Sequence, residues 1–345
     1  MKNELFIRLD EVDKKILIIL LRNSRINLTE LSEIIGSSYP MTRDRVNNLI
    51  KKGVITQFYP VLQFPGIGLR RYMSVYLSIK HSNLQEIIKN LKENNFITEI
   101  LELQGKYNVS IFLTTNFVKE AYGAVCWIQQ ICGDDLLDLI VMPTYIVSNM
   151  NRNFFLETDY KPEWNKMKTG YFPLFKKQEE IIHLGKPVKL KQEDFKILNY
   201  LRTDSEDPLE EISQKIKIND QKIDYKIKKY LKECLITYFT IDIDTDKLGY
   251  NKYLVFFNLR GSREGKDKII KELENINEAF HYYEYFNYWE LVVTFCVKDA
   301  KHLNQIMTRL QNKYENYIKQ YTEMPIIKKH KMTHYPDVEK VYPKV

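Results

Sequence analysis

The chain has 345 residues, of which 44% are hydrophobic and 28% are charged, a composition typical of folded proteins with two or three domains. Its formal net charge of +7 permits a polyanionic partner. The longest apolar run, residues 16–21, is too short to cross a bilayer, and residues 1–15 are too charged for a signal peptide. We therefore expect a cytoplasmic chain without a membrane partner.

Residues 10–52 carry the pattern of three short helices. These helices are expected at residues 10–21, 28–35 and 39–52. Between the second and the third helix, Gly36 allows a tight turn, Ser38 can cap the third helix, and Pro40 sits in its first turn. Two helices joined by a short turn that contains glycine, the second beginning at a capped end, form the helix-turn-helix pattern of DNA-binding proteins.

Residues 54–147 alternate between strand-like and helical segments. A first strand is expected at residues 54–62, next to the helix-turn-helix. It is followed by strand, helix, strand, strand, helix and strand at residues 71–80, 84–94, 96–103, 109–115, 117–131 and 136–147. This βαββαβ order predicts a ferredoxin-like unit, in which two helices cover one face of an antiparallel sheet.

The second half of the chain repeats the first. Residues 9–68 and 190–249 align without a gap at a spacing of 181 residues, and the strands and helices that follow also recur. One inserted residue near Tyr285 is expected to change the spacing to 182. The aligned turn residues are then Gly105 with Asn287 and Asn108 with Glu290. The predicted fold class is α+β, with two copies of a helix-turn-helix domain followed by a ferredoxin-like domain.

The repeat also predicts the domain boundaries. The first copy has its helix-turn-helix domain at residues 1–64 and its ferredoxin-like domain at 65–150; a connector covers 151–188; the second copy has the corresponding domains at 189–246 and 247–345, with a basic tail at 328–331. Because the connector is rich in aromatic residues, we expect it to be ordered and packed on the surface of the halves.

The two helix-turn-helix copies differ in charge. Residues 1–70 carry eleven Lys and Arg against seven Asp and Glu, whereas residues 186–250 carry thirteen of each. The second copy also has Lys217, Cys234 and Glu206 where the first has Gly36, Gly53 and Arg25. We expect the second copy to keep the fold, and direct reading of bases and a weaker contact with phosphates are left as equal alternatives for it.

The chain resembles the Lrp/AsnC (feast/famine) regulators. The resemblance lies in residues 9–17 (LDEVDKKIL), in residues 45–55 (RVNNLIKKGVI) and in the turn at residues 105–108 (GKYN), where Asn108 stands in place of the usual Asp. The family implies DNA-binding domains joined to ligand-sensing domains that dimerise through their sheets. A tandem duplication implies an intrachain pseudo-dimer for half-sites about 10 bp apart, or a multiple of that.

The candidate site residues follow from these motifs. Arg43 can donate to guanine and Asn47 can pair with adenine, whereas Arg45, Lys51 and Lys52 suit phosphates. The full DNA-binding set is Ser38, Tyr39, Pro40, Arg43, Asp44, Arg45, Asn47, Lys51 and Lys52, with Lys222, Tyr225 and Lys228 of the second copy. The effector set is Gly105, Tyr107, Asn108, Asn287 and Glu290. The alternatives are a solvated helix face for the first set and a plain hairpin turn for the second.

Two other functions stay open in the sequence. Siroheme decarboxylases of similar fold also occur as two fused halves, and His281 lies in an aromatic stretch. The second of these functions is that of an architectural protein that binds DNA with little sequence preference. The sequence contains no catalytic triad, phosphate-binding loop or metal-ligand spacing, so we expect no cofactor, and Cys126, Cys132, Cys234 and Cys296 read as small core residues. The expected partners are double-stranded DNA, a small effector such as an amino acid, and a second chain bound through the ferredoxin-like sheets.

Overall fold

The computed structural model describes residues 6–150, 154–162, 167–168, 170–171, 188–260 and 263–342. The chain divides into two compact units. Unit 1 contains Met1–Arg70, Leu156–Leu248 and Thr333–Val345, and unit 2 contains Arg71–Phe155 and Gly249–Met332. Both helix-turn-helix copies therefore belong to unit 1, and both ferredoxin-like copies belong to unit 2. Much of the expected connector, including residues 172–187, lies outside the described residues.

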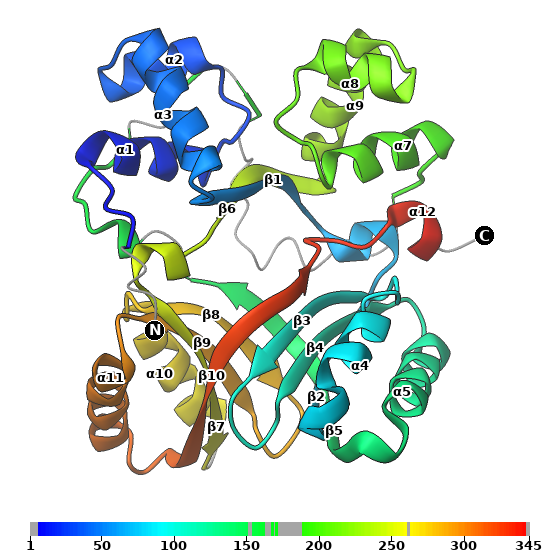
Figure 1. Cartoon of the computed structure of the whole chain (residues 1–345), viewed down its shortest axis with the longest axis vertical. Coiled ribbons are helices and arrows are strands. Elements are labelled where there is room, and N and C mark those ends of the chain that lie inside the picture. The colour runs from blue at the N-terminus through cyan, green and yellow to red at the C-terminus, as the bar shows by residue number, and fades with distance from the viewer. Residues whose placement is uncertain are drawn as a thin grey trace. The chain divides into compact units, whose positions relative to one another are not determined.

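Unit 1 contains the expected helices in both copies (Figure 1). The first copy has α1 (Glu11–Leu20), α2 (Leu28–Ile35), α3 (Tyr39–Lys51) and β1 (Ile55–Leu62), and the second has α7 (Gln192–Leu201), α8 (Leu209–Ile216), α9 (Asp220–Lys232) and β6 (Ile236–Ile243). In α1, Asp10 caps the helix by accepting from the backbone N–H groups of Val12 at 3.0 Å and Asp13 at 2.9 Å. The apolar stripe of each helix is buried in its own copy.

The two copies of unit 1 are joined by one strand from each. β1 and β6 form a two-stranded antiparallel sheet. The Gln63 N–H donates to Leu235 O at 2.8 Å, and the Asp244 N–H donates to Val54 O at 2.9 Å. Residues 63 and 244, like 54 and 235, are 181 positions apart, so the contact repeats under exchange of the copies. The pairing therefore follows the pseudo-twofold relation that the duplication predicts.

Short segments cover the first helix of each copy. Thr158 donates to Glu11 Oε2 at 3.1 Å on α1. In the second copy the buried Tyr335 donates to Leu198 O at 2.6 Å, and Asn199 donates to Asp337 at 2.8 Å, ahead of α12 (Val338–Val341). The chain after residue 332 therefore belongs to the second helix-turn-helix, and not to the ferredoxin-like domain in which the sequence analysis placed it.

Unit 2 has the predicted βαββαβ order twice. The first copy contains β2 (Arg71–Ile79), α4 (Leu84–Leu91), β3 (Ile97–Leu103), β4 (Val109–Thr115), α5 (Val118–Cys132) and β5 (Leu136–Asn149). The second contains β7 (Asn251–Leu259), α10 (Arg263–Glu274), β8 (Ala279–Tyr285), β9 (Leu291–Val297), α11 (Ala300–Lys313) and β10 (Ile318–Met332). Short 3-10 turns lie at Phe64–Ile67, His81–Asn83, Gly133–Asp135, Phe154–Leu156 and Asp246–Leu248.

The two sheets of unit 2 close into one eight-stranded barrel in the order β10-β3-β4-β2-β5-β8-β9-β7. β5 pairs with β2 and also with β8, and β10 pairs with β7 and also with β3. In Figure 1, α4 and α5 lie on one side of this barrel and α10 and α11 on another. The cluster at residues 328–331 is consequently part of β10 and not a solvated tail, because β3 supplies its partner strand.

The strand registers revise the position of the shift between the copies. Tyr253 pairs with Phe295 as Met73 pairs with Leu113, so β2 and β7 are 180 residues apart whereas β4 and β9 are 182 apart. β3 and β8 already show the spacing of 182. The shift therefore precedes β8, whereas the sequence analysis expected it at Tyr285.

No described helix is long and apolar enough to cross a bilayer.

Candidate nucleic-acid interface

Recognition helix α3 is positioned by the turn that the sequence predicts. Gly36 has φ +70°, so the backbone turns through the left-handed region between α2 and α3. The Ser38 hydroxyl accepts a hydrogen bond from Met41 N–H at 3.4 Å, and Pro40 lies in the first turn. The inward positions of the helix are buried: Thr42, Val46 and Leu49. The opposite face of α3 is therefore held outward.

The side chains predicted to read base edges lie on this outward face. Arg43, Asp44 and Asn47 are exposed, as is Tyr39 in the first turn. Arg43 Nη2 lies 3.4 Å from Asp44 Oδ1, but the two side chains are 53% and 64% exposed, so water and salt screen the pair. The Arg43 guanidinium and the Asn47 amide remain available for the donor and acceptor patterns of guanine and adenine.

Arg45 contacts protein carboxylates. Its Nη1 lies 2.5 Å from Asp10 Oδ2 and 3.0 Å from Asp13 Oδ1, both at the start of α1. Burial raises the pKa of Asp10, but hydrogen bonds from the Asp13 N–H and from Arg45 outweigh this effect and leave the pKa below its usual value. Arg45 thus ties α3 to α1, and its contact with phosphate stays a prediction.

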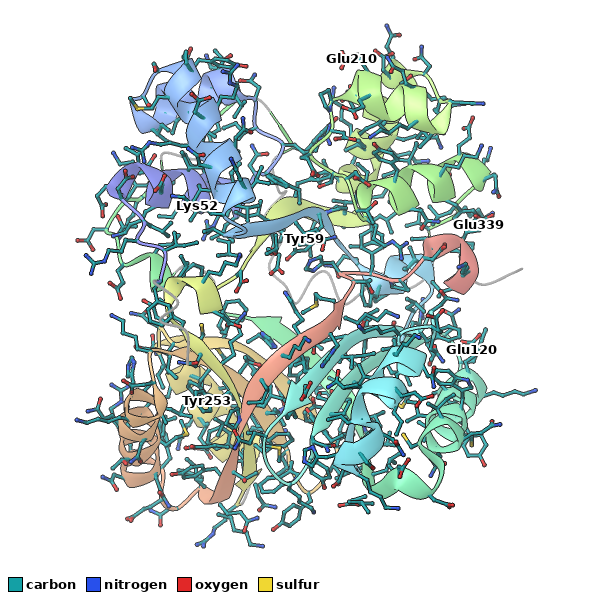
Figure 2. The ribbon with its side chains drawn as sticks, in the orientation of Figure 1. Lys52, Tyr59, Glu120, Glu210, Tyr253 and Glu339 are labelled. Atoms are coloured by element: carbon teal, nitrogen blue, oxygen red, sulfur yellow. The ribbon has the colours of Figure 1, made fainter. Side chains whose placement is uncertain are left out.

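The C-terminal end of α3 is positive. Lys51 and Lys52 are exposed there, and in the described part of the chain neither ammonium forms an ion pair. Figure 2 shows Lys52 between α3 and β1. Lys247 Nζ donates to Lys52 O at 2.9 Å, which brings a third ammonium group to this end. Such a group of cations is suited to contact with the phosphate backbone of DNA.

Several lysines of recognition helix α9 in the second copy are paired with carboxylates, whereas Lys232, the counterpart of Lys51, is exposed and has no ion pair among the described residues. The Nζ–O distances of these pairs are 2.6 Å each for Lys222 with Glu193, Lys226 with Asp194 and Lys228 with Asp224. The predicted contacts on this helix, Lys222, Tyr225 and Lys228, are all exposed. Water and salt therefore weaken the pairs of Lys222 and Lys228, and only the pair between Lys226 and Asp194 is largely buried. The sequence showed a balanced net charge, and the structure shows that the balance is local.

The turns of the second copy keep the geometry of the first without glycine. Lys217 has φ +56°, close to the φ of +70° at Gly36, and Cys234 has φ +57°, close to the φ of +69° at Gly53. The α8–α9 turn and the end of α9 therefore follow the same path as their counterparts. The second copy has kept the fold of a helix-turn-helix and has changed its surface charges.

The predicted effector residues occupy two equivalent turns in unit 2. Asn108 is buried; its Oδ1 accepts from Ile79 N–H at 3.0 Å and its Nδ2 donates to Ile79 O at 2.6 Å. Glu290 Oε2 accepts from Leu259 N–H at 2.9 Å. Residues 79 and 259 are the equivalent last residues of β2 and β7. Asn108 and Glu290 therefore hold the ends of these strands.

The remaining effector candidates are also close to protein atoms. Gly105 has φ +144°, and a Cβ there would lie 3.3 Å from Met324 Cγ. Tyr107 is buried in the barrel, and Asn287 Nδ2 donates to Val141 O at 3.2 Å. These contacts favour a structural hairpin turn at both places. An effector contact at these residues stays a prediction.

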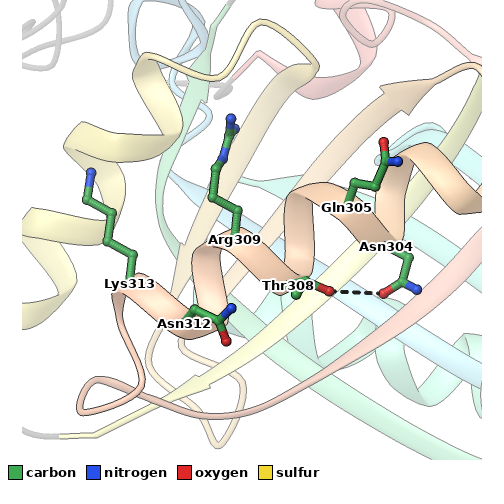
Figure 3. Close-up of a pocket in the computed structure, with 6 residues that line it drawn as sticks. All are labelled: Asn304, Gln305, Thr308, Arg309, Asn312 and Lys313. Atoms are coloured by element: carbon green, nitrogen blue, oxygen red, sulfur yellow. Dashed lines mark hydrogen bonds between the residues drawn. The ribbon is translucent and has the colours of Figure 1, made fainter.

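A hollow on the outer face of α11 has a polar lining (Figure 3). Asn304, Gln305, Thr308, Arg309, Asn312 and Lys313 surround it. The Thr308 hydroxyl donates to Asn304 Oδ1 at 3.3 Å, and Lys313 Nζ lies 2.7 Å from Glu272 Oε2. The hollow lacks the apolar and aromatic side chains that line most small-molecule sites, so we assign no ligand to it.

Arg25 and Tyr171 form contacts that the sequence analysis did not assign. Arg25 lies between α1 and α2, and its guanidinium donates to backbone carbonyls of the second copy. Tyr171, from the connector, donates to Asp224 Oδ1 at 2.8 Å on α9. Arg25 and its counterpart Glu206 have opposite charges. This difference was the signal in the sequence that the two copies are not equivalent at this position.

Comparison with known proteins supports the same class. Residues 9–56 match the winged helix-turn-helix DNA-binding family. The HTH-type transcriptional regulator Ptr1 of Methanocaldococcus jannaschii is 35% identical over 100 residues, which cover 29% of this chain and 68% of Ptr1. The HTH-type transcriptional regulator LrpA of Pyrococcus abyssi is 29% identical over 131 residues, or 38% of this chain and 82% of LrpA. The fold, the exposed helix and these relatives define a helix-turn-helix transcriptional regulator.

The chain belongs to the Lrp/AsnC family of transcriptional regulators, as a tandem duplication. Among solved structures, the siroheme decarboxylase NirDL has a TM-score of 0.63 at 10% identity, and the match covers 96% of this chain and 97% of NirDL. A likeness at this identity shows a shared two-copy fold and no shared chemistry. The relatives with higher identity are regulators, and we class the chain as a DNA-binding regulator and not as an enzyme.

Proposed function

We propose that one chain binds one DNA duplex through two unequal helix-turn-helix domains, with α3 as the helix that reads base edges. The observation that carries this proposal is the contrast between the recognition helices. Arg43 and Asn47 are exposed on α3, and Lys51 and Lys52 add unpaired positive charge at its end. On α9, Asp224 and Lys228 stand at the positions of Arg43 and Asn47 and pair with each other at 2.6 Å, so α9 adds a weaker contact with little sequence preference.

The stoichiometry follows from pairing within the chain. β1 pairs with β6 in unit 1, and all eight strands of the unit 2 barrel have two neighbours within the chain. The strand edges through which a second chain was expected to bind are therefore occupied. One chain per duplex is the expected complex, and its mass by light scattering is that of the duplex plus 41.3 kDa. A complex that holds two chains per duplex contradicts this stoichiometry.

Selection of bound sequences from a random duplex pool tests the reading helix. Arg43→Ala is expected to weaken binding to the selected site by about 1–3 kcal/mol and to relax one base position, because a bidentate contact with guanine is lost. Lys222→Ala is the matched control, since it removes a paired cation from the equivalent helix, and its effect is expected to be small. Equal losses in both variants, or no loss in either, would refute the unequal roles.

A small effector such as an amino acid is a separate proposal for residues 105–108 and 287–290. It is supported by the resemblance of the turn at residues 105–108 to the sensing domain of the family. A thermal-shift screen of the twenty amino acids tests it. A ligand that raises Tm in a saturable way, and that also changes the affinity for the selected DNA, is the expected result.

A further inference from the structure

Arg25 connects the two helix-turn-helix copies of unit 1. Its Nη2 donates to Asp207 O at 3.1 Å, and its Nη1 donates to Ser205 O. Both carbonyls lie in the loop between α7 and α8, which is the counterpart of the loop that carries Arg25. A guanidinium that bonds two carbonyls of one loop fixes the distance and the angle of approach more tightly than a single contact does.

Two aromatic rings enclose the same guanidinium. Its central carbon lies 5.6 Å from the ring centre of Tyr171 and 5.7 Å from that of Phe239 on β6. Burial lowers the pKa of Arg25, and the nearby negative charges of Asp207 and Glu206 act in the opposite direction. Two backbone carbonyls and two aromatic rings therefore surround a buried guanidinium.

Tyr171 extends this contact to the second recognition helix. Its hydroxyl donates to Asp224 Oδ1 at 2.8 Å, and its ring lies 5.4 Å from that of Phe239. Asp224 belongs to α9, where Lys228 Nζ lies 2.6 Å from the other carboxylate oxygen. A continuous set of contacts therefore runs from the α1–α2 loop of the first copy through Arg25 and Tyr171 to α9.

This contact is asymmetric although the copies are related by a pseudo-twofold. The residue equivalent to Arg25 is Glu206, flanked by the carbonyls that accept from Arg25. If two first copies paired with each other, two arginines would meet at these positions, and like charges oppose that pairing. The substitution thus favours pairing of the first copy with a second copy.

We propose that Arg25 and Tyr171 are positioning residues that fix α9 relative to α3 and thereby set the spacing between the two DNA contacts of one chain. The inference rests on the proposed function for its effect on DNA, whereas the geometry itself can be measured without DNA. A rigid link between two contacts raises affinity only for the spacing that it matches.

The first experiment measures the separation of the recognition helices in the full chain without DNA. Spin labels are placed through a non-natural amino acid at Met41 on α3 and at Tyr225 on α9, both of which are exposed. A narrow distance distribution is expected for the unaltered chain, and a broader one for Arg25→Ala and for Tyr171→Phe. Tyr171→Phe keeps the ring and removes only the hydrogen bond to Asp224, so it remains informative if Arg25→Ala fails to fold.

The second experiment measures binding to duplexes built on the selected site, in which the flanking contact is moved in steps of one base pair through one helical turn. The unaltered chain should prefer one spacing. Arg25→Ala should reduce that preference by about tenfold, the factor expected for loss of a hydrogen bond from a charged group. The affinity of Arg25→Ala for the isolated α3 site should stay unchanged, and Arg8→Ala, which removes an exposed arginine elsewhere in unit 1, should change neither quantity.

The outcomes separate the two proposals. The positioning role is overturned if Arg25→Ala and Tyr171→Phe give the same distance distributions and spacing profiles as the unaltered chain. Failure of the unaltered chain to prefer any sequence overturns the proposed function, and the distance measurement then still decides whether Arg25 and Tyr171 hold the helices.

Discussion

Cys234 and Lys217 hold a backbone conformation that their side chains disfavour. Both have φ near +57°, where a Cβ approaches the following carbonyl oxygen, and the equivalent residues of the first copy are glycines. Replacement of either by glycine should raise the free energy of unfolding, because relief of this strain is worth about 1 kcal/mol and exceeds the added entropy of the unfolded chain. Urea unfolding followed by circular dichroism measures the effect.

Gly36→Ala is the matched control for these variants. A Cβ at Gly36 would meet no atom within 4 Å, so only the left-handed backbone opposes the alanine. This variant should lower the free energy of unfolding by about 1 kcal/mol. If Cys234→Gly lowered the urea midpoint instead of raising it, packing of the Cys234 side chain would outweigh the backbone strain.

At the scale of helices, each copy joins its first helix to its recognition helix through an ion pair at equivalent positions. Arg45 contacts Asp13 in the first copy, and Lys226 contacts Asp194 in the second; both pairs are related by the spacing of 181. Two of the residues that carry the family resemblance therefore stabilise the domain. This explains why the second copy keeps the fold although its DNA face has changed.

The second of these pairs predicts a loss of stability in acid. Burial raises the pKa of Asp194, but hydrogen bonds from Lys226 and Tyr230 outweigh it and leave the pKa below its usual value of about 4. A carboxyl with a lowered pKa stabilises the fold above about pH 4, and this contribution disappears as the pH falls through the folded-state pKa. Urea midpoints measured from pH 7 to pH 2 should therefore fall steeply below pH 4.

Asp194→Asn should lower the free energy of unfolding at pH 7 by about 3 kcal/mol, because Lys226 loses its nearest carboxylate in a largely buried site. The variant should also show a shallower decline below pH 4. Glu193→Gln is the control, since it removes the exposed Glu193–Lys222 pair and only a contact of 4.0 Å with Lys226, and it should change the midpoint little. An acid limb of equal steepness in Asp194→Asn and the unaltered chain would assign the acid sensitivity to other carboxyls.

The helices and strands were predicted from the sequence more accurately than the contacts between distant segments. Helical periodicity, the Ser38 cap and the Gly36 turn are local signals, so α3 was found with nearly correct bounds. β10 extends to Met332 and includes residues 328–331, which were expected to form a tail, because its last residues pair with β3 of the other copy. The contact between Arg45 and Asp10 was not predicted for the same reason, since the two residues are 35 positions apart. Contacts between distant segments leave no periodic pattern in the sequence.

At the scale of the molecule, the duplication has allowed each pairing surface to form within one chain. Two identical copies that pair about a twofold axis carry the same residue at every equivalent position. A fused pair can have Arg25 in one copy and Glu206 at the equivalent position of the other. The same freedom allows α3 to carry Arg43 and Asn47 where α9 has the paired Asp224 and Lys228. The fused chain can therefore bind a DNA site whose two halves differ.

The interior of the unit 2 barrel bears on the likeness to siroheme decarboxylase. It is filled by side chains that include Tyr76, Tyr107, Phe256, Tyr285 and Met324, all nearly inaccessible to solvent. Ser74 and Tyr285 hydroxyls lie 2.7 Å apart, and burial raises the pKa of Tyr76 to about 12, so these phenols are neutral at pH 7. The Glu99 carboxylate on β3 also acts on the buried Tyr76 and Tyr283, so a closely packed interior with negative charge nearby is unfavourable for a polycarboxylate macrocycle.

The chain should therefore not bind an iron uroporphyrin specifically. His281, the imidazole considered as a candidate in the sequence, has its Nε2 3.0 Å from Thr294 Oγ1. Titration in 0.5 M salt, followed in the Soret band with a haem-binding globin as positive control, should show no saturable shift. A shift that saturates at one macrocycle per chain would contradict this prediction, because the barrel would have to open to admit it.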